Sequence, residues 1–175
     1  MTDIDRFLSL YQQQVTLSLN VLEGIPPALW TSIPADSETD YLGTRISRIT
    51  IAALAAHLLQ AEDYWISSLA EIDHGQLLPP PVGVPMLKPS EFGMPLIRQY
   101  RQALDTNIDR VCALAAEQLA TKFNFISRTY TVQGFLWAVY AHHCYYFGQI
   151  DLLLRQQGHM PPEFLELPQQ GRLIA

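Results

Sequence analysis

The sequence predicts an all-α fold, a bundle of four long antiparallel helices with almost no β-strand. Four segments repeat apolar residues every three or four positions, which is the period of a helix with one buried face. Each segment ends near a residue that caps or breaks a helix. At 1.5 Å per residue the segments make helices ~30–40 Å long, and helices of this length pack side by side as a bundle. We expect one domain over residues 1–175.

The first two helices are predicted over residues 2–23 and 51–72. Gly24 and the proline pair that follows it stop the first helix. Thr50 is expected to cap the second, because its hydroxyl can accept hydrogen bonds from the free backbone N–H groups of the first turn. The apolar stripe of the first helix consists of Ile4, Phe7, Leu8, Tyr11, Val15 and Leu22.

The third and fourth helices are predicted over residues 95–119 and 132–157. Thr131 is expected to cap the fourth helix, and Gly158 with the proline pair beyond it ends that helix. The apolar stripe of the third helix consists of Ile97, Tyr100, Leu104, Ile108, Val111 and Ala115.

The joints between these helices are of two kinds. Residues 24–49 and 73–94 are long and rich in proline, and such lengths fit crossover connections across a bundle. Residues 122–131, KFNFISRTYT, alternate apolar and polar side chains, which is typical of a short extended pair.

Composition argues against several classes of function. Hydrophobic residues make up 49% of the chain and charged residues 16%, with a net charge of −6 and no cluster of Lys or Arg, so nucleic-acid binding is disfavoured. The two cysteines, Cys112 and Cys144, form no CxxC pair, which fits a reducing cytoplasm better than a disulfide framework. The N-terminus has acids where a signal peptide would have basic residues.

The longest apolar stretch, residues 135–154, also carries polar groups that a membrane-spanning helix rarely tolerates: His142, His143, Gln149 and Asp151. We therefore expect no contact with a membrane and a cytoplasmic location.

Two histidines on different helices are expected to point into the bundle. On a helical wheel His142 shares its face with Tyr146 and Gln149, and His57 shares its face with Ala61 and Tyr64. Either histidine alone is best explained as a core residue with a hydrogen-bond partner. Together they favour a shared site, because bundles build metal and ligand sites from inward side chains on facing helices.

The neighbours of these histidines have weaker claims to a role in the site. His143 lies about a quarter-turn from His142 and is expected outside the pocket, while Glu62 and Asp63 are expected to turn toward solvent. Gln149 either orients one of the two histidines or is an ordinary core amide.

Other polar and aromatic residues are expected to serve the fold. Arg155 near the end of the fourth helix suits the helix dipole or an ion pair, and Cys144 lies opposite His142, where it is a poor candidate for a nucleophile. Trp30, Trp65 and Trp137 are expected to be core or interface anchors. We find no Ser-His-Asp constellation, P-loop or dinucleotide fingerprint.

Two segments resemble the DinB-like four-helix-bundle superfamily, which includes bacterial thiol-dependent transferases. Residues 50–65, TIAALAAHLLQAEDYW, are similar to the family's second helix. Residues 142–158, HHCYYFGQIDLLLRQQG, are similar to the family's fourth helix. In the family that helix carries an HxxxH motif, followed by a Gly-Gln pair and a Leu-Arg-x-x-Gly ending. The resemblance implies a bundle of the up-down-down-up type.

The resemblance also implies a divalent metal held by three histidines. His57 matches the first ligand and His142 the second, but the third position falls on Tyr146. Three neutral imidazoles suit Zn²⁺ or Ni²⁺, whereas two bind less firmly. A phenol binds a metal well only after losing its proton, and its reference pKa is about 10. A weak metal site and a metal-free polar pocket therefore both stay open.

Two functions follow from these alternatives. One is a metal-dependent transferase or hydrolase that acts on a small molecule or a thiol adduct. The other is a non-catalytic small-molecule-binding protein that has lost its metal. We expect His57 and His142 to lie within reach of one bridging metal or water, with Tyr146 beside them. His57→Ala should then abolish any metal binding, and His143→Ala should leave it nearly intact.

The fourth helix is apolar on nearly all sides, with Trp137, Tyr140, Ala141 and Tyr145 away from the His142 face. A helix of this kind is covered on more than one side. Because members of the resembling family often pair, we expect a homodimer.

Overall fold

A computed structural model describes residues 1–34, 46, 48–83 and 87–162. Its main body consists of four long helices: α1 (Asp3–Glu23), α2 (Ile51–Leu69), α3 (Met94–Cys112) and α5 (Val132–Gln156). A short 3-10 helix, η1 (Pro27–Thr31), follows α1. The prediction of an all-α four-helix bundle is confirmed.

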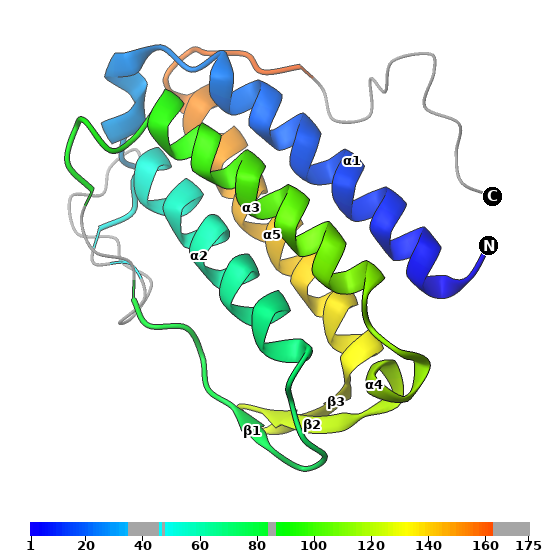
Figure 1. The fold of residues 1–175 in the computed structure, drawn as a ribbon. Coiled ribbons are helices and arrows are strands. Elements are labelled where there is room, and N and C mark those ends of the chain that lie inside the picture. Colours follow the sequence, from blue (N-terminus) through cyan, green and yellow to red (C-terminus); the bar gives the residue numbers. More distant parts are fainter. Residues whose placement is uncertain (35–45, 47, 84–86, 163–175) are drawn as a thin grey trace.

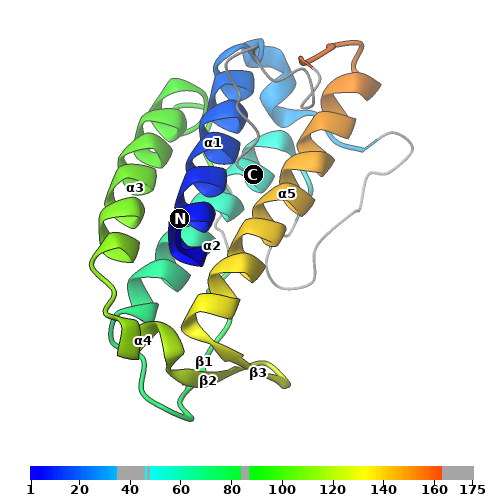
Figure 2. The ribbon, with the colours of Figure 1, turned by 90° about the vertical axis from the view of Figure 1, so that its right-hand side faces the viewer.

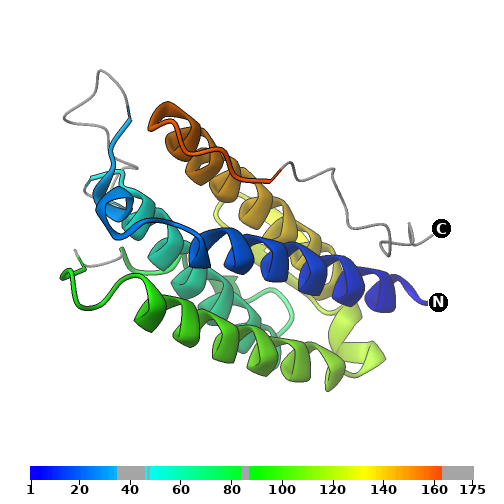
Figure 3. The same ribbon diagram turned by 90° about the horizontal axis from the view of Figure 1, so that it is seen from above.

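The helices run up, down, down and up in chain order (Figure 1). α1 and α2 lie diagonally opposite each other, and each of them packs against both α3 and α5. The seams α1–α3 and α2–α5 are therefore antiparallel, while α2–α3 and α1–α5 are parallel, so the expectation of antiparallel helices holds for two of the four seams. The α2–α3 seam is parallel because the chain returns from the end of α2 to the opposite end of the bundle before α3 begins. Seen from above, α1 lies between α3 and α5 (Figure 3).

The predicted caps form. The hydroxyl of Thr50 accepts a hydrogen bond from the Ala53 backbone N–H, and the hydroxyl of Thr131 accepts one from that of Gly134, each at 3.0 Å. α1 begins with a capping box in which Thr2 and Asp5 satisfy each other's backbone N–H groups. Gly158, at φ 72°, follows the end of α5 in the left-handed conformation that glycine adopts readily.

Two helices end earlier than predicted. α2 ends at Leu69 instead of residue 72, and α3 ends at Cys112 instead of residue 119. The chain is extended at Ala115 and then forms a separate short helix, α4 (Ala116–Ala120). From α4, the side-chain amide of Gln118 donates to the carbonyls of Leu69 and Ile72 at 2.7 and 3.2 Å, so it satisfies groups that the end of α2 leaves unpaired.

A small three-stranded sheet closes one end of the bundle (Figure 2). β2 (Lys122–Phe125) and β3 (Arg128–Thr131) form the extended pair predicted over residues 122–131, with Ile126 at φ 56° in the turn. β1 (Leu77–Leu78) pairs in parallel with β2, which the pattern of so short a segment does not predict.

The core lies between the four helices and reaches the sheet. Trp65 meets Phe125 and Phe135 edge to face, with ring centroids 5.7 Å apart in both pairs. Trp30 is buried, and the half-buried Trp137 donates its indole N–H to Asp3, so all three tryptophans anchor the fold. No helix among the described residues is both long enough and apolar enough to cross a membrane.

Candidate functional site

His57 from α2 and His142 from α5 meet across the antiparallel seam between these helices. Their Nε2 atoms are 3.2 Å apart, and their ring centroids are 5.1 Å apart. His57 is 2% exposed, while His142 is half-buried. The sequence places these residues 85 positions apart, and the packing of the two helices brings their rings together as predicted.

The separation of the two Nε2 atoms suits both a metal site and a metal-free pair joined by a hydrogen bond. Two imidazoles on one tetrahedral Zn²⁺, with bonds of about 2.0–2.1 Å, have nitrogens about 3.3–3.4 Å apart. The observed 3.2 Å is close to that value, and it also fits a direct N–H···N hydrogen bond between two neutral rings. The pair is thus arranged as two ligands of one ion without any movement of the helices.

Aromatic rings close this pocket. Tyr146 stands one helical turn from His142, is 4% exposed, and lies with its ring centroid 4.5 Å from that of His142 and 4.7 Å from that of His57. Trp65 covers His142 edge-on at 4.7 Å. Tyr146 therefore lines the pocket as predicted, and Trp65 is a wall of it that the sequence analysis assigned only to the core.

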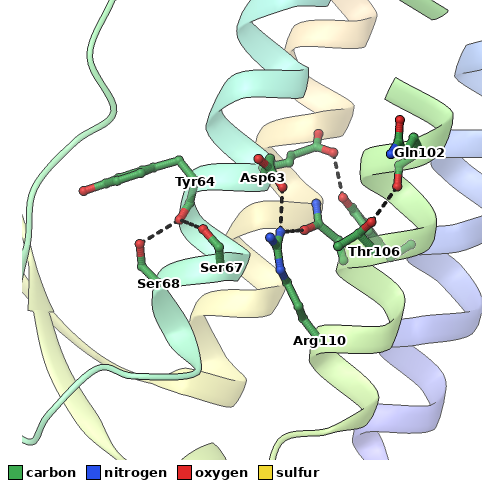
Figure 4. A network of polar contacts seen from close by, with 10 residues as sticks. Asp63, Tyr64, Ser67, Ser68, Gln102, Thr106 and Arg110 are labelled. Atoms are coloured by element: carbon green, nitrogen blue, oxygen red, sulfur yellow. Dashed lines mark hydrogen bonds and ion pairs between the residues drawn. The ribbon is translucent and has the colours of Figure 1, made fainter. Parts of the chain in front are cut away.

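The other predicted pocket residues are less involved. Ala61 is completely buried one turn from His57, where a larger side chain would crowd the imidazole. Tyr64 is half-buried, and its side chain points away from α3 (Figure 4). Gln149 is half-buried and makes no hydrogen bond to either histidine in the described structure.

The donor set meets only part of the family's requirement for a metal. Within the described residues, no group of three or more His, Cys, Asp or Glu side chains is placed to hold an ion. His57 and His142 fit two ligand positions, and Tyr146 is the neighbouring oxygen-bearing side chain. Among the described residues, His57 and His142 are therefore the two side chains placed to hold a metal here.

A second polar cluster lies in the core, and it is the main surprise of the structure. His143 is completely buried, and its Nδ1 is 2.7 Å from Oε1 of Glu62, which is also completely buried. Tyr11 donates its hydroxyl to the other carboxylate oxygen of Glu62 at 2.7 Å. The Nε2 of His143 lies 2.8 Å from the hydroxyl of Ser18, and the Nδ1 of His143 lies 3.1 Å from the hydroxyl of Tyr100. We name these five residues the core network; they come from all four long helices.

Ser18, His143 and Glu62 are connected in the order of a Ser-His-acid triad, which the sequence analysis did not find. Substrate must reach the nucleophile of such a triad, but all three side chains are fully buried. The Ser18 hydroxyl also lies 3.0 Å from the Gln14 carbonyl within its own helix. The arrangement therefore holds the four helices together and is not placed to attack a substrate.

Burial and charge set the chemistry of the core network. Burial, followed by the nearby charge of Glu62, raises the pKa of Tyr11 well above its usual value of 10.0, and the same causes raise that of Tyr100. Both phenols thus stay protonated as hydrogen-bond donors. Where Ser18 donates its one proton to Gln14, Nε2 of His143 is the donor in its contact with the Ser18 hydroxyl.

The expectation that Glu62 faces solvent is therefore wrong, whereas that for Asp63 is right. Asp63 is 47% exposed and pairs with Arg110. The helical wheel assumed one buried face, but α2 is covered by both α3 and α5. The signal was present in the sequence: Glu62 interrupts the buried stripe of Ile51, Ala55, Leu58, Ile66 and Leu69.

The same reasoning applies to His143. It lies outside the His57–His142 pocket, as predicted, but it occupies the buried stripe of α5 formed by Leu136, Val139, Phe147, Ile150 and Leu154. An ionisable residue in the middle of such a stripe indicates a buried partner on a facing helix.

The remaining candidates behave as expected. Arg155 forms an ion pair with Asp151 one turn earlier, at 2.7 Å. Cys144 and Cys112 are free thiols, and burial raises the pKa of the half-buried Cys144 thiol. A low pKa is what activates a cysteine, so Cys144 is a weaker nucleophile than an ordinary exposed thiol.

Comparison with known proteins agrees with this architecture. A DinB-like protein from Bacillus subtilis superposes with a TM-score of 0.66 at 15% identity, over 91% of this chain and 96% of that protein. YfiT from Bacillus subtilis, described as a probable metal-dependent hydrolase with an unusual four-helix bundle topology, superposes with a TM-score of 0.66 at 12% identity, over 89% of this chain and 88% of that one. A search of curated proteins gave no match.

At this level of identity the structural likeness establishes the fold and nothing finer. The family is established by the sequence itself, because the model of the DinB family matches residues 6–170, nearly the whole chain. The four-helix bundle is consistent with that match. The chain belongs to the DinB family.

Proposed function

We propose that the protein binds a divalent metal ion, Zn²⁺ or Ni²⁺, between His57 and His142, and that it is a metal-dependent hydrolase or transferase acting on a small molecule or a thiol adduct. The observation that carries the proposal is the 3.2 Å separation of the two Nε2 atoms at the α2–α5 seam, where His57 is 2% exposed. The description of YfiT as a probable metal-dependent hydrolase on the same fold supports it.

The residues of the pocket have distinct tasks in this proposal. A bound Zn²⁺ or Ni²⁺ would supply Lewis acidity, which lowers the pKa of a water or thiol. His57 and His142 hold the ion through Nε2. Trp65 and Tyr146 surround the imidazoles with apolar ring surface, which excludes bulk water and fixes the ring orientations.

A metal-free binding protein is the second candidate. It is favoured by the tyrosine at the position of the family's third ligand, together with the lack of a three-ligand group among the described residues. In that case the 3.2 Å contact is a hydrogen bond between the two imidazoles, and the aromatic pocket receives a small molecule without chemistry.

The experiment that separates the candidates is titration of tag-free protein with Zn²⁺ and Ni²⁺ by isothermal calorimetry. His57→Ala and His142→Ala should each abolish binding. Because His143 is part of the core network, His143→Ala would disturb the fold, and the exposed His74 is the better control. His74→Ala should bind like the wild type, and absence of binding by the wild type would overturn the metal proposal.

Activity is tested next on the metal-loaded protein. Hydrolysis of p-nitrophenyl acetate and transfer of glutathione to a chlorinated fluorogenic probe cover the two reaction classes. Turnover that is lost on chelation and in His57→Ala supports the enzyme. Metal binding without turnover in either assay would overturn the proposed hydrolase or transferase activity and leave a metal-binding protein.

We also propose a homodimer through the outer face of α5. Tyr145 is 65% exposed and Leu152 is 56% exposed two turns further along, with the exposed Gly148 between them. These residues lie on one side of the helix, and two copies of such a face can bury each other's apolar surface.

A further inference from the structure

A polar cavity of about 620 Å³ lies on the outer side of the parallel α2–α3 seam, away from both the His57–His142 pocket and the core network. Figure 4 shows part of its wall, with Asp63 and Ser67 from α2 facing Gln102, Thr106 and Arg110 from α3. The cavity is large enough for a small molecule and open to solvent.

The charges of the cavity are balanced. Its lining holds one acid and one base, Asp63 and Arg110, which pair at 2.6 Å. A simple anion would approach Asp63 as well as Arg110, and a simple cation would approach Arg110 as well as Asp63. A ligand with both charges a short distance apart can lie antiparallel to this pair and match each charge with its opposite.

Arg110 has hydrogen-bond donors in the cavity that its contacts with described residues do not use. The bonds of Arg110 to described residues, to Asp63 and Asn107, both use Nη1, so Nε and Nη2 can donate elsewhere. Gln60, Gln99 and Gln102 also line the cavity and add side-chain amides to its wall.

We propose that this cavity binds a free α-amino acid in its zwitterionic form. Its carboxylate binds Nε and Nη2 of Arg110, and its ammonium group binds the outer oxygen of Asp63. Its side chain runs toward Gln99 and Gln102, whose amides favour a polar side chain. L-Glutamine fits this description and serves as the probe.

The test is a titration of the full chain with L-glutamine, followed by the backbone amide resonances of Gln60, Gln102 and Thr106 in heteronuclear NMR. N-acetyl-L-glutamine lacks the ammonium group, and L-glutamine amide lacks the carboxylate. Each should bind about tenfold more weakly or worse, because each loses one charge-assisted interaction. Glucose, a neutral polyol of similar size, should leave the resonances unchanged.

Two variants and a matched control complete the test. Arg110→Gln and Asp63→Asn should each weaken binding of L-glutamine about tenfold or more. Arg101 also lies on α3, but it pairs with Glu23 of α1 and does not line the cavity, so Arg101→Gln should bind like the wild type. Saturating shifts from glucose, equal binding of the blocked analogues, or no shift with L-glutamine at millimolar concentration would each overturn the proposal.

Discussion

Replacing His143 by leucine should destabilise the protein more than any single change on its surface. The substitution keeps a large apolar volume in the core but removes the partner of Glu62, whose carboxylate is completely buried. Glu62 then keeps its hydrogen bond from Tyr11 and loses its counterion. Breaking a buried pair by removing one partner costs about 3–5 kcal/mol, because the other charge stays buried without compensation.

The size of the effect makes it measurable by urea unfolding, followed by circular dichroism at 222 nm. With an m-value of about 2 kcal/mol/M, a loss of about 3–5 kcal/mol lowers the midpoint by about 1.5–2.5 M urea. Asp63→Asn serves as the control, since the Asp63–Arg110 pair is partly exposed and such pairs contribute about 0–1 kcal/mol.

A double-mutant cycle isolates the interaction. Glu62→Leu should cost about as much as His143→Leu, but the double variant should be far more stable than the sum of the two losses predicts. Replacing both partners by apolar groups removes the buried charges together with their attraction. If either single variant fails to fold, Glu62→Gln is a milder probe, because glutamine retains one acceptor and should cost about 1–3 kcal/mol.

Two results would refute this reasoning. A loss below about 1 kcal/mol for His143→Leu would mean that the pair contributes no more than an exposed one. Losses that simply add in the double variant would mean that His143 and Glu62 do not interact.

The remaining predictions concern titration, thiol reactivity and assembly. Because burial raises the pKa of Tyr11 and Tyr100 well above 10.0, an unfolded chain releases their protons first, and the free energy of unfolding should fall as the pH rises above about 10. Absorbance at 295 nm should show two of the eight tyrosines ionising only on unfolding, and their titration in the folded state near pH 10 would contradict this. Cys112 is exposed, whereas burial raises the pKa of Cys144, so Ellman's reagent at pH 8 should give two phases at least about tenfold apart; equal rates would count against the placement of Cys144. Light scattering at micromolar concentration should give a dimer, and Leu152→Glu should give a monomer, whereas a monomeric wild type would exclude the α5 interface.

Much of the fold is determined locally by the sequence. Gly24 marks the end of α1, Thr50 marks the start of α2, and Thr131 and Gly158 mark the two ends of α5. These signals can be read from the sequence because helix capping depends on adjacent residues. The β2–β3 hairpin follows from alternation within ten residues. The early end of α3 and the strand β1 cannot be read from local sequence, because both depend on contacts with distant segments. After α3 ends, the separate helix α4 bonds to the end of α2 through Gln118, and β1 pairs with β2.

Part of the candidate site could likewise be predicted from the sequence, and part depends on how the helices pack. The phase of each helix was enough to place His57 and His142 on inward faces, and one seam between α2 and α5 then brings them together. A helical wheel describes a helix with one covered side, which is why it failed for Glu62 and did not reveal the buried partners of His143. Both lie on sides of α2 and α5 that other helices cover.

The sequence by itself therefore determined the helices, their caps and the histidine pair, since these depend on periodicity and on neighbouring residues. Only the tertiary structure decided that Glu62 and His143 form a buried pair with Ser18, Tyr11 and Tyr100, and that a balanced polar cavity opens between α2 and α3. The burial of a polar group and the width of a seam depend on which helices lie beside it and in which direction they run. Those relations are set by the simultaneous packing of all four helices, and no single segment encodes them.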